Sequence, residues 1–332
     1  MRIDVHVHLT PPYLLDDRKD ALRGEPALEL LYGDESARMS GTPELLASMD
    51  GGRVDMALVG GFPFRGEQGA LRFNSWILEE CARHPDRLLG MAAFDPRAPF
   101  AEKHARWFLE QGGFGLGELC VYDQGLTDPV LDRLEALMSI ASERGAPVLV
   151  HVNEPVGHSY PGKAPMEIRQ IDSLVRRSRG ARLVLAHFGG GLPFFAALKR
   201  QMKESLATVR FDTAAMPFLY DPSALKAAAG FLGAGSFLYG SDYPLLGPGR
   251  YEKYFREAGL TGEETDLVFG EAAGDFLGLR GPLRASVPAA ASGPVRASGP
   301  AGASGPVVAT GPVMASGPDG DLEPAEESEA SA

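Results

Sequence analysis

The stretch IDVHVH at residues 3–8 opens the chain and has the alternation of a strand, with apolar residues at every second position. Alternate side chains of a strand lie on the same face, so Asp4, His6 and His8 share one face and the apolar residues share the other. Two imidazoles at this spacing near the end of a strand can bind one metal ion. For an isolated pair, the alternative is two histidines buried in a core.

Seven further apolar runs follow, separated by amphipathic segments. The predicted strands are Ile3–His8, Met56–Gly60, Leu88–Phe94, Phe114–Leu119, Pro147–Val152, Arg182–His187, Thr208–Asp212 and Phe237–Asp242; the main predicted helices are Ala70–His84, Phe100–Glu110, Pro129–Arg144, Met166–Arg179 and Leu192–Leu206. Apolar strands that alternate with helices indicate a parallel sheet covered on both faces. Eight such units predict an α/β fold, the (β/α)₈ TIM barrel. A doubly wound open sheet is the alternative, but no GxGxxG follows the first strand.

The composition limits the function classes. The chain has 332 residues and a formal net charge of −12, which argues against a nucleic-acid partner, because such proteins need a basic surface. No apolar run reaches the ~18 residues that a membrane span needs, and the N-terminal stretch has no signal-peptide core. The two cysteines have no CxxC spacing. We therefore expect a soluble cytoplasmic protein without a membrane partner.

The composition changes abruptly near residue 281. Residues 281–332 contain eight glycines and eight prolines, no aromatic residue, and a six-residue repeat of the ASGP type before an acidic end. Such a segment cannot bury enough apolar surface to offset its loss of conformational entropy. We predict a barrel over residues 1–280 and a disordered tail over residues 281–332.

Other predicted strands also end in polar residues, as the first strand ends in His6 and His8. His151, His187 and Asp242 stand at the ends of predicted strands five, six and eight. Active sites of TIM barrels form at the C-terminal ends of the strands, so these side chains are expected to converge on a metal site with the first pair. His84 and His104 fall within helical patterns and are expected on the surface.

Four motifs occur in an order that resembles a known family. They are DVHVH at residues 4–8, VLVHVNEP at 148–155, VLAHFGGG at 184–191 and LYGSDYP at 238–244. This set resembles the amidohydrolase superfamily, and in particular the branch that contains aminocarboxymuconate-semialdehyde decarboxylase and related metal-dependent barrels. The resemblance covers residues 1 to about 279 and implies His6, His8, His151 and Asp242 as ligands of a divalent metal, usually Zn²⁺ and sometimes Mn²⁺. It implies that His187 contacts the metal-bound water or the substrate.

The chemistry of these residue types agrees with that assignment. Three imidazoles and one carboxylate can hold a catalytic zinc ion that lowers the pKa of a bound water from about 15.7 to about 7. His187, with an ordinary pKa of about 6.5, and Asp242 are the catalytic candidates for moving the proton. Glu118, at the end of the fourth strand, has two interpretations: a metal ligand that can bridge two ions, or a carboxylate bonded to a neighbouring histidine or to substrate.

The loops after the strands should supply the substrate contacts. The first loop, residues 10–41, is long enough to predict a lid over the site. Arg65 and Lys163 are candidates for binding a substrate carboxylate, and His158 and Tyr160 form a candidate acid–base pair. For each cation, the alternative is a solvated surface charge.

These observations favour a metal-dependent hydrolase that cleaves a lactone, amide or related C–O or C–N bond in a small carbonyl compound through a metal-activated water. The first alternative is a non-oxidative decarboxylase of an unsaturated or aromatic carboxylic acid. The second is a non-catalytic binding protein on the same barrel. The partner expected in each case is a small molecule, and relatives of this kind are often homodimers. Neither the substrate nor the number of metal ions follows from the sequence.

Overall fold

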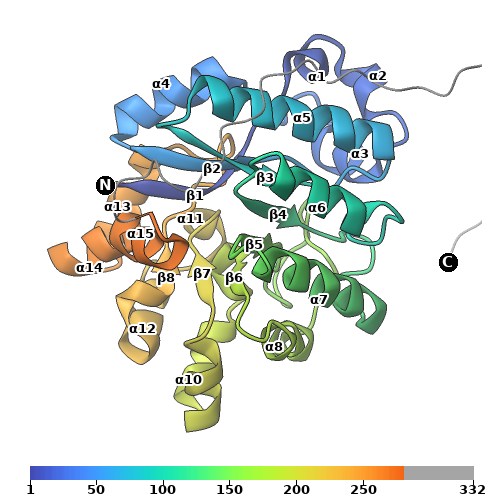
Figure 1. The fold of residues 1–332 in the computed structure, drawn as a ribbon. Helices are drawn as coiled ribbons and strands as arrows, with labels where there is room; N and C mark the ends of the chain where they lie inside the picture. The colour runs from blue at the N-terminus through green and yellow to red at the C-terminus, as the bar shows by residue number, and fades with distance from the viewer. Residues whose placement is uncertain (280–332) are drawn as a thin grey trace, which may run out of the picture. The chain divides into compact units, whose positions relative to one another are not determined.

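The computed structural model describes residues 1–279 and confirms the eight-stranded parallel barrel (Figure 1). Each strand pairs in parallel with the next along the chain, from β1 to β8. The strands are β1 (Ile3–His8), β2 (Met56–Gly60), β3 (Leu88–Ala92), β4 (Gly115–Leu119), β5 (Pro147–Val150), β6 (Arg182–Leu185), β7 (Arg210–Asp212) and β8 (Phe237–Leu238). The predicted tail, residues 281–332, lies outside the described residues.

Several strands end earlier than predicted, and the reason lies in the backbone. The prediction was wrong in extending β6 to His187 and β8 to Asp242, because β6 ends at Leu185 and β8 at Leu238. His187 and Asp242 have φ values of 51° and 60°, and a positive φ is incompatible with a strand, so neither residue can belong to one. The polar residues therefore stand on the first turn after a strand.

The barrel closes through the segment that follows β8. The backbone N–H of Val5 donates to the carbonyl of Tyr239 (2.9 Å), and the N–H of Asp242 donates to the carbonyl of His6 (3.0 Å). A Cβ at Gly240 would lie 2.8 Å from the Cβ of His6, which explains why this close approach needs glycine. The closure brings Asp242 against β1.

Helices surround the strands (Figure 1). The longer ones are α4 (Thr42–Gly52), α5 (Glu67–Arg83), α6 (Ala101–Glu110), α7 (Asp128–Ser142), α8 (Ile168–Arg177), α10 (Arg200–Leu206), α12 (Ser223–Leu232) and α13 (Pro248–Glu257), with the shorter α14 (Gly262–Asp266) and α15 (Ala272–Leu277) at the end. The predicted helix over residues 192–206 is interrupted at Lys199, whose backbone is extended, and its first part is the 3₁₀ helix Leu192–Ala197. No helix within residues 1–279 is long and apolar enough to cross a membrane.

The long first loop contains three short helices, α1 (Pro12–Asp16), α2 (Arg18–Leu22) and α3 (Pro26–Tyr32). The guanidinium of Arg18 donates to the carbonyls of Tyr32 (2.8 Å) and Asp34 (2.6 Å), which fixes the turn after α3. Leu28 and Tyr32 are buried. The segment is therefore packed against the barrel, and its last part lines the cavity described below.

Apolar side chains form the interior of the fold. The largest cluster joins strand residues such as Val59 and Val148 to helix residues such as Phe73 and Leu134. A second cluster joins Ile3 of β1 to Leu277 of α15. Burial of these groups, at roughly 25 cal/mol per Å², is the main source of stability and does not involve the polar strand ends.

His104 is buried, which corrects the expectation of a surface position. Its ring is packed between Phe100 and Trp107, and its Nε2 lies 3.2 Å from the Nδ2 of Asn74. The Asn74 amide also bonds the backbone of Ala93 through both its nitrogen and its oxygen (3.0 Å each). Because the amide nitrogen is the donor in this pair, Nε2 must be unprotonated.

We expect this histidine to make stability pH-dependent. Burial lowers the pKa of His104 to about 4, whereas the unfolded chain has a value of about 6.5. Protonation thus favours the unfolded state, and the free energy of unfolding should fall by about 2 kcal/mol between pH 7 and pH 5 because of this residue. His104→Gln keeps an acceptor but does not titrate. Urea denaturation at both pH values should show a smaller acid-induced loss in His104→Gln; equal losses in the two proteins would contradict the assignment.

Candidate active site

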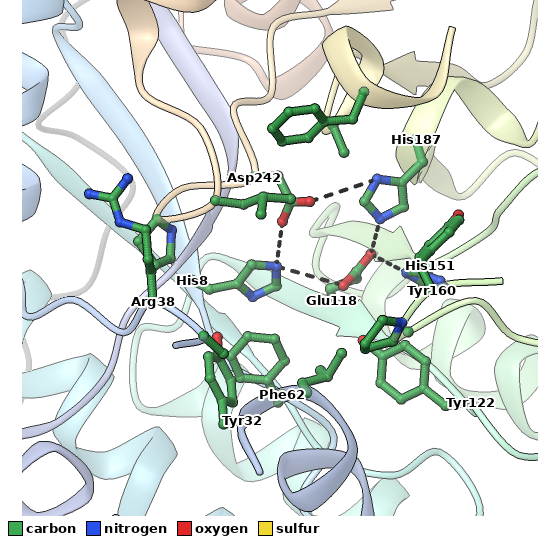
Figure 2. Close-up of a pocket in the computed structure, with 18 of the residues that line it drawn as sticks. His8, Tyr32, Arg38, Phe62, Glu118, Tyr122, His151, Tyr160, His187 and Asp242 are labelled. Atoms are coloured by element: carbon green, nitrogen blue, oxygen red, sulfur yellow. Dashed lines mark hydrogen bonds and ion pairs between the residues drawn. The ribbon is translucent and has the colours of Figure 1, made fainter. Parts of the chain in front are cut away.

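Six side chains of types that can bind a metal meet at the C-terminal ends of the strands, and Figure 2 labels all of them except His6. They come from β1, from β4, and from the turns after β5, β6 and β8: His6, His8, Glu118, His151, His187 and Asp242. All are buried or nearly so. The structure thus brings together every residue that the sequence analysis placed at or near a metal.

The two histidines of β1 and Asp242 are close enough to share one ion. The Nε2 atoms of His6 and His8 lie 3.0 Å apart, and Asp242 Oδ1 lies 3.2 Å from His8 Nε2 and 3.7 Å from His6 Nε2. Two atoms that each bind one zinc ion at about 2.1 Å cannot lie more than about 4.2 Å apart. All three separations meet this limit.

Glu118 lies between two pairs of histidines. Its Oε1 accepts a hydrogen bond from Nδ1 of His151 (2.9 Å) and lies 3.4 Å from Nε2 of His187. The same carboxylate is 3.7 Å from Nε2 of His6 and 3.8 Å from Nε2 of His8. Both interpretations of Glu118 are compatible with this position.

The donor set fits a divalent metal. Nε2 of His151 is buried and has no hydrogen-bond partner within residues 1–279, although buried polar atoms are normally paired. Imidazole nitrogens together with carboxylate oxygens suit Zn²⁺, and Mn²⁺ is accommodated when oxygen ligands contribute. Two overlapping groups, His6–His8–Glu118 and Glu118–His151–His187, can each hold an ion.

The two carboxylates are held in the ionised form. Burial raises the pKa of Glu118, but the neighbouring His151 and His6 outweigh it and leave the pKa well below the ordinary value. Burial likewise raises the pKa of Asp242, and its hydrogen bond with His8 and the charge of His6 reverse the shift, so the net change is downward. Both carboxylates are therefore ionised beside His6, whose pKa is raised to about 10, so a metal ion that bound this ring would replace its Nε2 proton.

The ordinary pKa expected for His187 is wrong. Burial alone would lower the pKa of His187. The hydrogen bond to Glu118 and the charge of Asp242 have a larger and opposite effect, so the pKa is raised to about 9. The ring is therefore a proton donor at neutral pH in the protein alone. Its Nδ1 lies 3.1 Å from the carbonyl oxygen of Ala214, which fixes the ring plane.

His187 and Asp242 reach the site from unusual backbone conformations. His187, Phe188 and Asp242 all have left-handed φ values, of 51°, 59° and 60°. For residues other than glycine this conformation costs roughly 1–2 kcal/mol each, so the surrounding fold must impose it. Strain that coincides with polar strand ends is typical of functional sites.

Asp212 is a site residue that the sequence analysis missed. It is fully buried at the end of β7, and its Oδ2 lies 2.8 Å from Nδ1 of His6. Its Oδ1 accepts from the backbone N–H groups of His187 (2.8 Å) and Ala214 (2.9 Å). Its position in the sequence could have identified it, because Asp212 stands at the end of a predicted strand, as His151 and His187 do.

A cavity of about 560 Å³ opens above the metal-ligand side chains. Its walls include five aromatic side chains: Tyr32, Phe62, Tyr122 and Tyr160, which Figure 2 labels, and Phe218. The ring of Phe62 stacks on His8 with centroids 4.4 Å apart, and Tyr122 meets His151 edge-on at 5.1 Å. The cavity has the size and the apolar walls of a small-molecule site.

The loop candidates divide into two groups. His158 and Tyr160 line the cavity, with Tyr160 donating to Glu154 (2.9 Å). Arg65 and Lys163, the candidates for binding a substrate carboxylate, are not among the residues that line it. Arg65 is exposed to solvent, and the ammonium of Lys163 is neutralised by Glu154 (2.8 Å).

Arg38 is instead the arginine that lines the cavity, next to the first-loop residues Tyr32 and Ala37. No hydrogen bond or ion pair holds its guanidinium within the described part of the chain, and Figure 2 shows the guanidinium turned away from the histidines. The sequence analysis missed Arg38 because the first loop has no pattern that marks a binding residue.

The sequence profile of the amidohydrolase family matches residues 3–279. The chain belongs to the amidohydrolase family. This match confirms the resemblance drawn from the four motifs, and it identifies an enzyme, which sets aside the non-catalytic alternative. A comparison of this amidohydrolase with curated proteins found no match.

Solved structures similar to this amidohydrolase share its barrel. The 5-carboxyvanillate decarboxylase of Sphingomonas paucimobilis has 20% identity and a TM-score of 0.61, with 83% of this chain and 98% of that chain covered. The 2,6-dihydroxybenzoate decarboxylase from Rhizobium has 17% identity and a TM-score of 0.61, with 84% and 99% covered. A dihydroxybenzoic acid decarboxylase from a Polaromonas species, solved with manganese and the inhibitor 2-nitroresorcinol, has 15% identity and a TM-score of 0.59, with 85% and 98% covered.

Proposed function

We propose that this enzyme is a metal-dependent, non-oxidative decarboxylase of an aromatic or unsaturated carboxylic acid. The observation that carries the proposal is the aromatic-walled cavity directly above a buried cluster of histidines and carboxylates. The structural neighbours include decarboxylases of hydroxylated benzoic acids, one of them with bound manganese and a nitro-substituted aromatic inhibitor. Flat walls such as the ring of Phe62 suit a planar substrate.

We propose His6, His8, His151 and Asp242 as the ligands of the metal, either Zn²⁺ or Mn²⁺. When bound, such an ion would hold the substrate carboxylate and an adjacent oxygen and would withdraw electron density from the ring. Glu118 would then keep its hydrogen bond with His151 and orient that ring (2.9 Å).

The protein's own residues can supply the proton that the reaction consumes. When the bond between the substrate carbon and its carboxylate breaks, the electron pair stays on carbon and carbon dioxide leaves. That carbon needs one proton, so the balance is one carboxylate and one proton to one product and one carbon dioxide. His187 lines the cavity and has a pKa raised to about 9, so it can donate this proton at neutral pH. Its Nε2 lies 3.4 Å from Oε1 of Glu118, an ionised carboxylate that stabilises the protonated form of the ring.

Hydrolysis of a C–O or C–N bond is the second candidate, and one observation favours it. Glu118 belongs to both groups that can hold an ion, so it could bridge a pair of metals. Paired metal ions about 3.5–4 Å apart are typical of hydrolytic sites that activate water. The metal content of the purified enzyme therefore bears directly on the choice between the two reactions.

The two reactions differ in the product that must be measured. The enzyme, reconstituted separately with Zn²⁺ and Mn²⁺, is incubated with hydroxylated benzoic acids, unsaturated carboxylic acids, lactones and amides. We expect carbon dioxide and decarboxylated product in equal amounts from an aromatic or unsaturated acid. Acid production from a lactone or amide, without carbon dioxide, would refute decarboxylation and establish hydrolysis.

Arg38 should bind an oxygen substituent of the substrate that lies away from the carboxylate held at the histidine cluster. Its guanidinium is exposed at the cavity wall, so Arg38→Met should raise KM by about 10- to 100-fold, the usual value of a charged hydrogen bond, with kcat within a few fold. Arg65→Met is the matched control, because Arg65 is exposed and outside the cavity lining. Equal KM values for the two variants would remove Arg38 from substrate binding.

A further inference from the structure

We infer that Asp212 is a positioning residue that decides which ring nitrogen of His6 is available to a metal. The inference rests on the metal dependence proposed above, but not on which reaction follows. Asp212 itself lies outside the cavity lining and does not touch the substrate space. It acts through His6, whose Nδ1 lies 2.8 Å from its Oδ2.

The two oxygens of Asp212 have separate tasks. Oδ1 accepts hydrogen bonds from the backbone N–H groups of His187 (2.8 Å) and Ala214 (2.9 Å), and this pair fixes the carboxylate plane. Oδ2 then faces Nδ1 of His6. An ionised carboxylate can only accept, so Nδ1 of His6 must carry a proton.

The protonated Nδ1 determines what the other nitrogen can do. In a neutral imidazole with a proton on Nδ1, Nε2 has a free lone pair. Nε2 of His6 lies 3.0 Å from Nε2 of His8 and 3.7 Å from Asp242 Oδ1, so the lone pair belongs to the metal-ligand cluster. A histidine whose second nitrogen donates to a carboxylate is the usual form of a metal-binding imidazole.

The geometry makes Asp212→Asn a test of this role and not merely of the charge. The backbone N–H groups of His187 and Ala214 both point at the position of Oδ1, so the asparagine must place its oxygen there. Its NH₂ group then faces Nδ1 of His6 as a donor. Nδ1 must accept, the ring proton moves to Nε2, and the lone pair that would bind metal is lost.

Asp4 provides a matched control. It is also a buried aspartate beside His6, but its Oδ1 accepts from the backbone N–H groups of Ser241 (2.9 Å) and His6 (3.2 Å) and not from the His6 ring. Asp4→Asn makes the same replacement at a similar depth and leaves Nδ1 of His6 paired with Asp212. The two variants therefore separate the replacement of a buried aspartate from loss of the hydrogen bond to the ring.

The experiment measures zinc affinity by competition with a chromophoric chelator, together with ¹⁵N NMR of histidine-labelled protein. We expect Asp212→Asn to bind Zn²⁺ about 10- to 100-fold more weakly than wild type and Asp4→Asn to stay within a few fold. The His6 proton should lie on Nδ1 in the zinc-loaded wild type and on Nε2 in metal-free Asp212→Asn.

Three results would count against the inference or its premise. Unchanged zinc affinity in Asp212→Asn, or equal weakening in both variants, would overturn the positioning role. A wild-type His6 ring with its proton on Nε2 would overturn it without any variant, even if Asp212→Asn fails to fold. Absence of both zinc and manganese binding by the wild-type enzyme would instead refute the proposed metal dependence.

Discussion

Alanine at both His6 and His8 should empty the metal site, abolish turnover and leave the barrel folded. The two rings supply nitrogens only 3.0 Å apart, and we propose that they are two of the four protein ligands. Loss of a residue that merely supports a ligand weakens metal binding about 10- to 100-fold, so loss of two ligands should weaken it by about 10³-fold or more. Metal analysis of protein purified without chelator measures this directly.

The fold should survive this double change. The apolar clusters that join strands to helices, such as the one containing Val148 and Leu134, do not include either ring. Far-UV circular dichroism should therefore match that of the wild type. His84→Ala, at a half-buried position at the end of α5, is the control that should keep full metal content. Full metal content in the double variant would show that the ion is bound elsewhere.

The second large effect concerns His187→Asn, which should lower kcat by about 10²–10⁴ while metal content stays near the wild-type level. Asparagine is the suitable replacement because it tolerates the left-handed backbone found at this position, where φ is 51°. It also keeps the backbone N–H that donates to Asp212. The change therefore removes the proton donor and little else.

Metal stoichiometry and kcat measured on the same His187→Asn preparation give distinct answers. Unchanged kcat would exclude His187 from the mechanism. Loss of about half of the bound metal would identify it as a ligand of a second ion shared through Glu118, and would favour the hydrolytic candidate. The metal stoichiometry can be measured without knowing the natural substrate.

The barrel and the cluster of histidines and carboxylates could be predicted because their signals are local. Alternation within residues 3–8 and apolar runs before His151 and His187 mark strands and their polar ends, whatever the rest of the chain does. Parallel strands then bring those ends to one face of the barrel. The strand boundaries were less accurate, because a positive φ at Asp242 leaves no trace in the residue pattern.

The remaining site residues depend on contacts between distant segments. Asp212 acquires its role only because β7 lies beside the turn after β6, and Arg38 only because the first loop packs over the cavity. Arg65 and Lys163 had the right chemistry, but solvent exposure and a local ion pair place them elsewhere. His104 was expected on the surface, but it lies on the buried face of α6, where Asn74 donates a hydrogen bond to its ring.

The segment that closes the barrel also completes the candidate metal site, so the site can form only after nearly the whole barrel has been synthesised. The same stretch that closes the ring, residues 239–243, contributes Asp242 opposite the histidines of β1. During translation the first strand emerges long before that stretch, and domains fold as units once their sequence is available. A chain released before residue 242 would lack Asp242, the carboxylate that lies 3.2 Å from Nε2 of His8. Chemical activity would therefore begin only in molecules whose first and last strands have met.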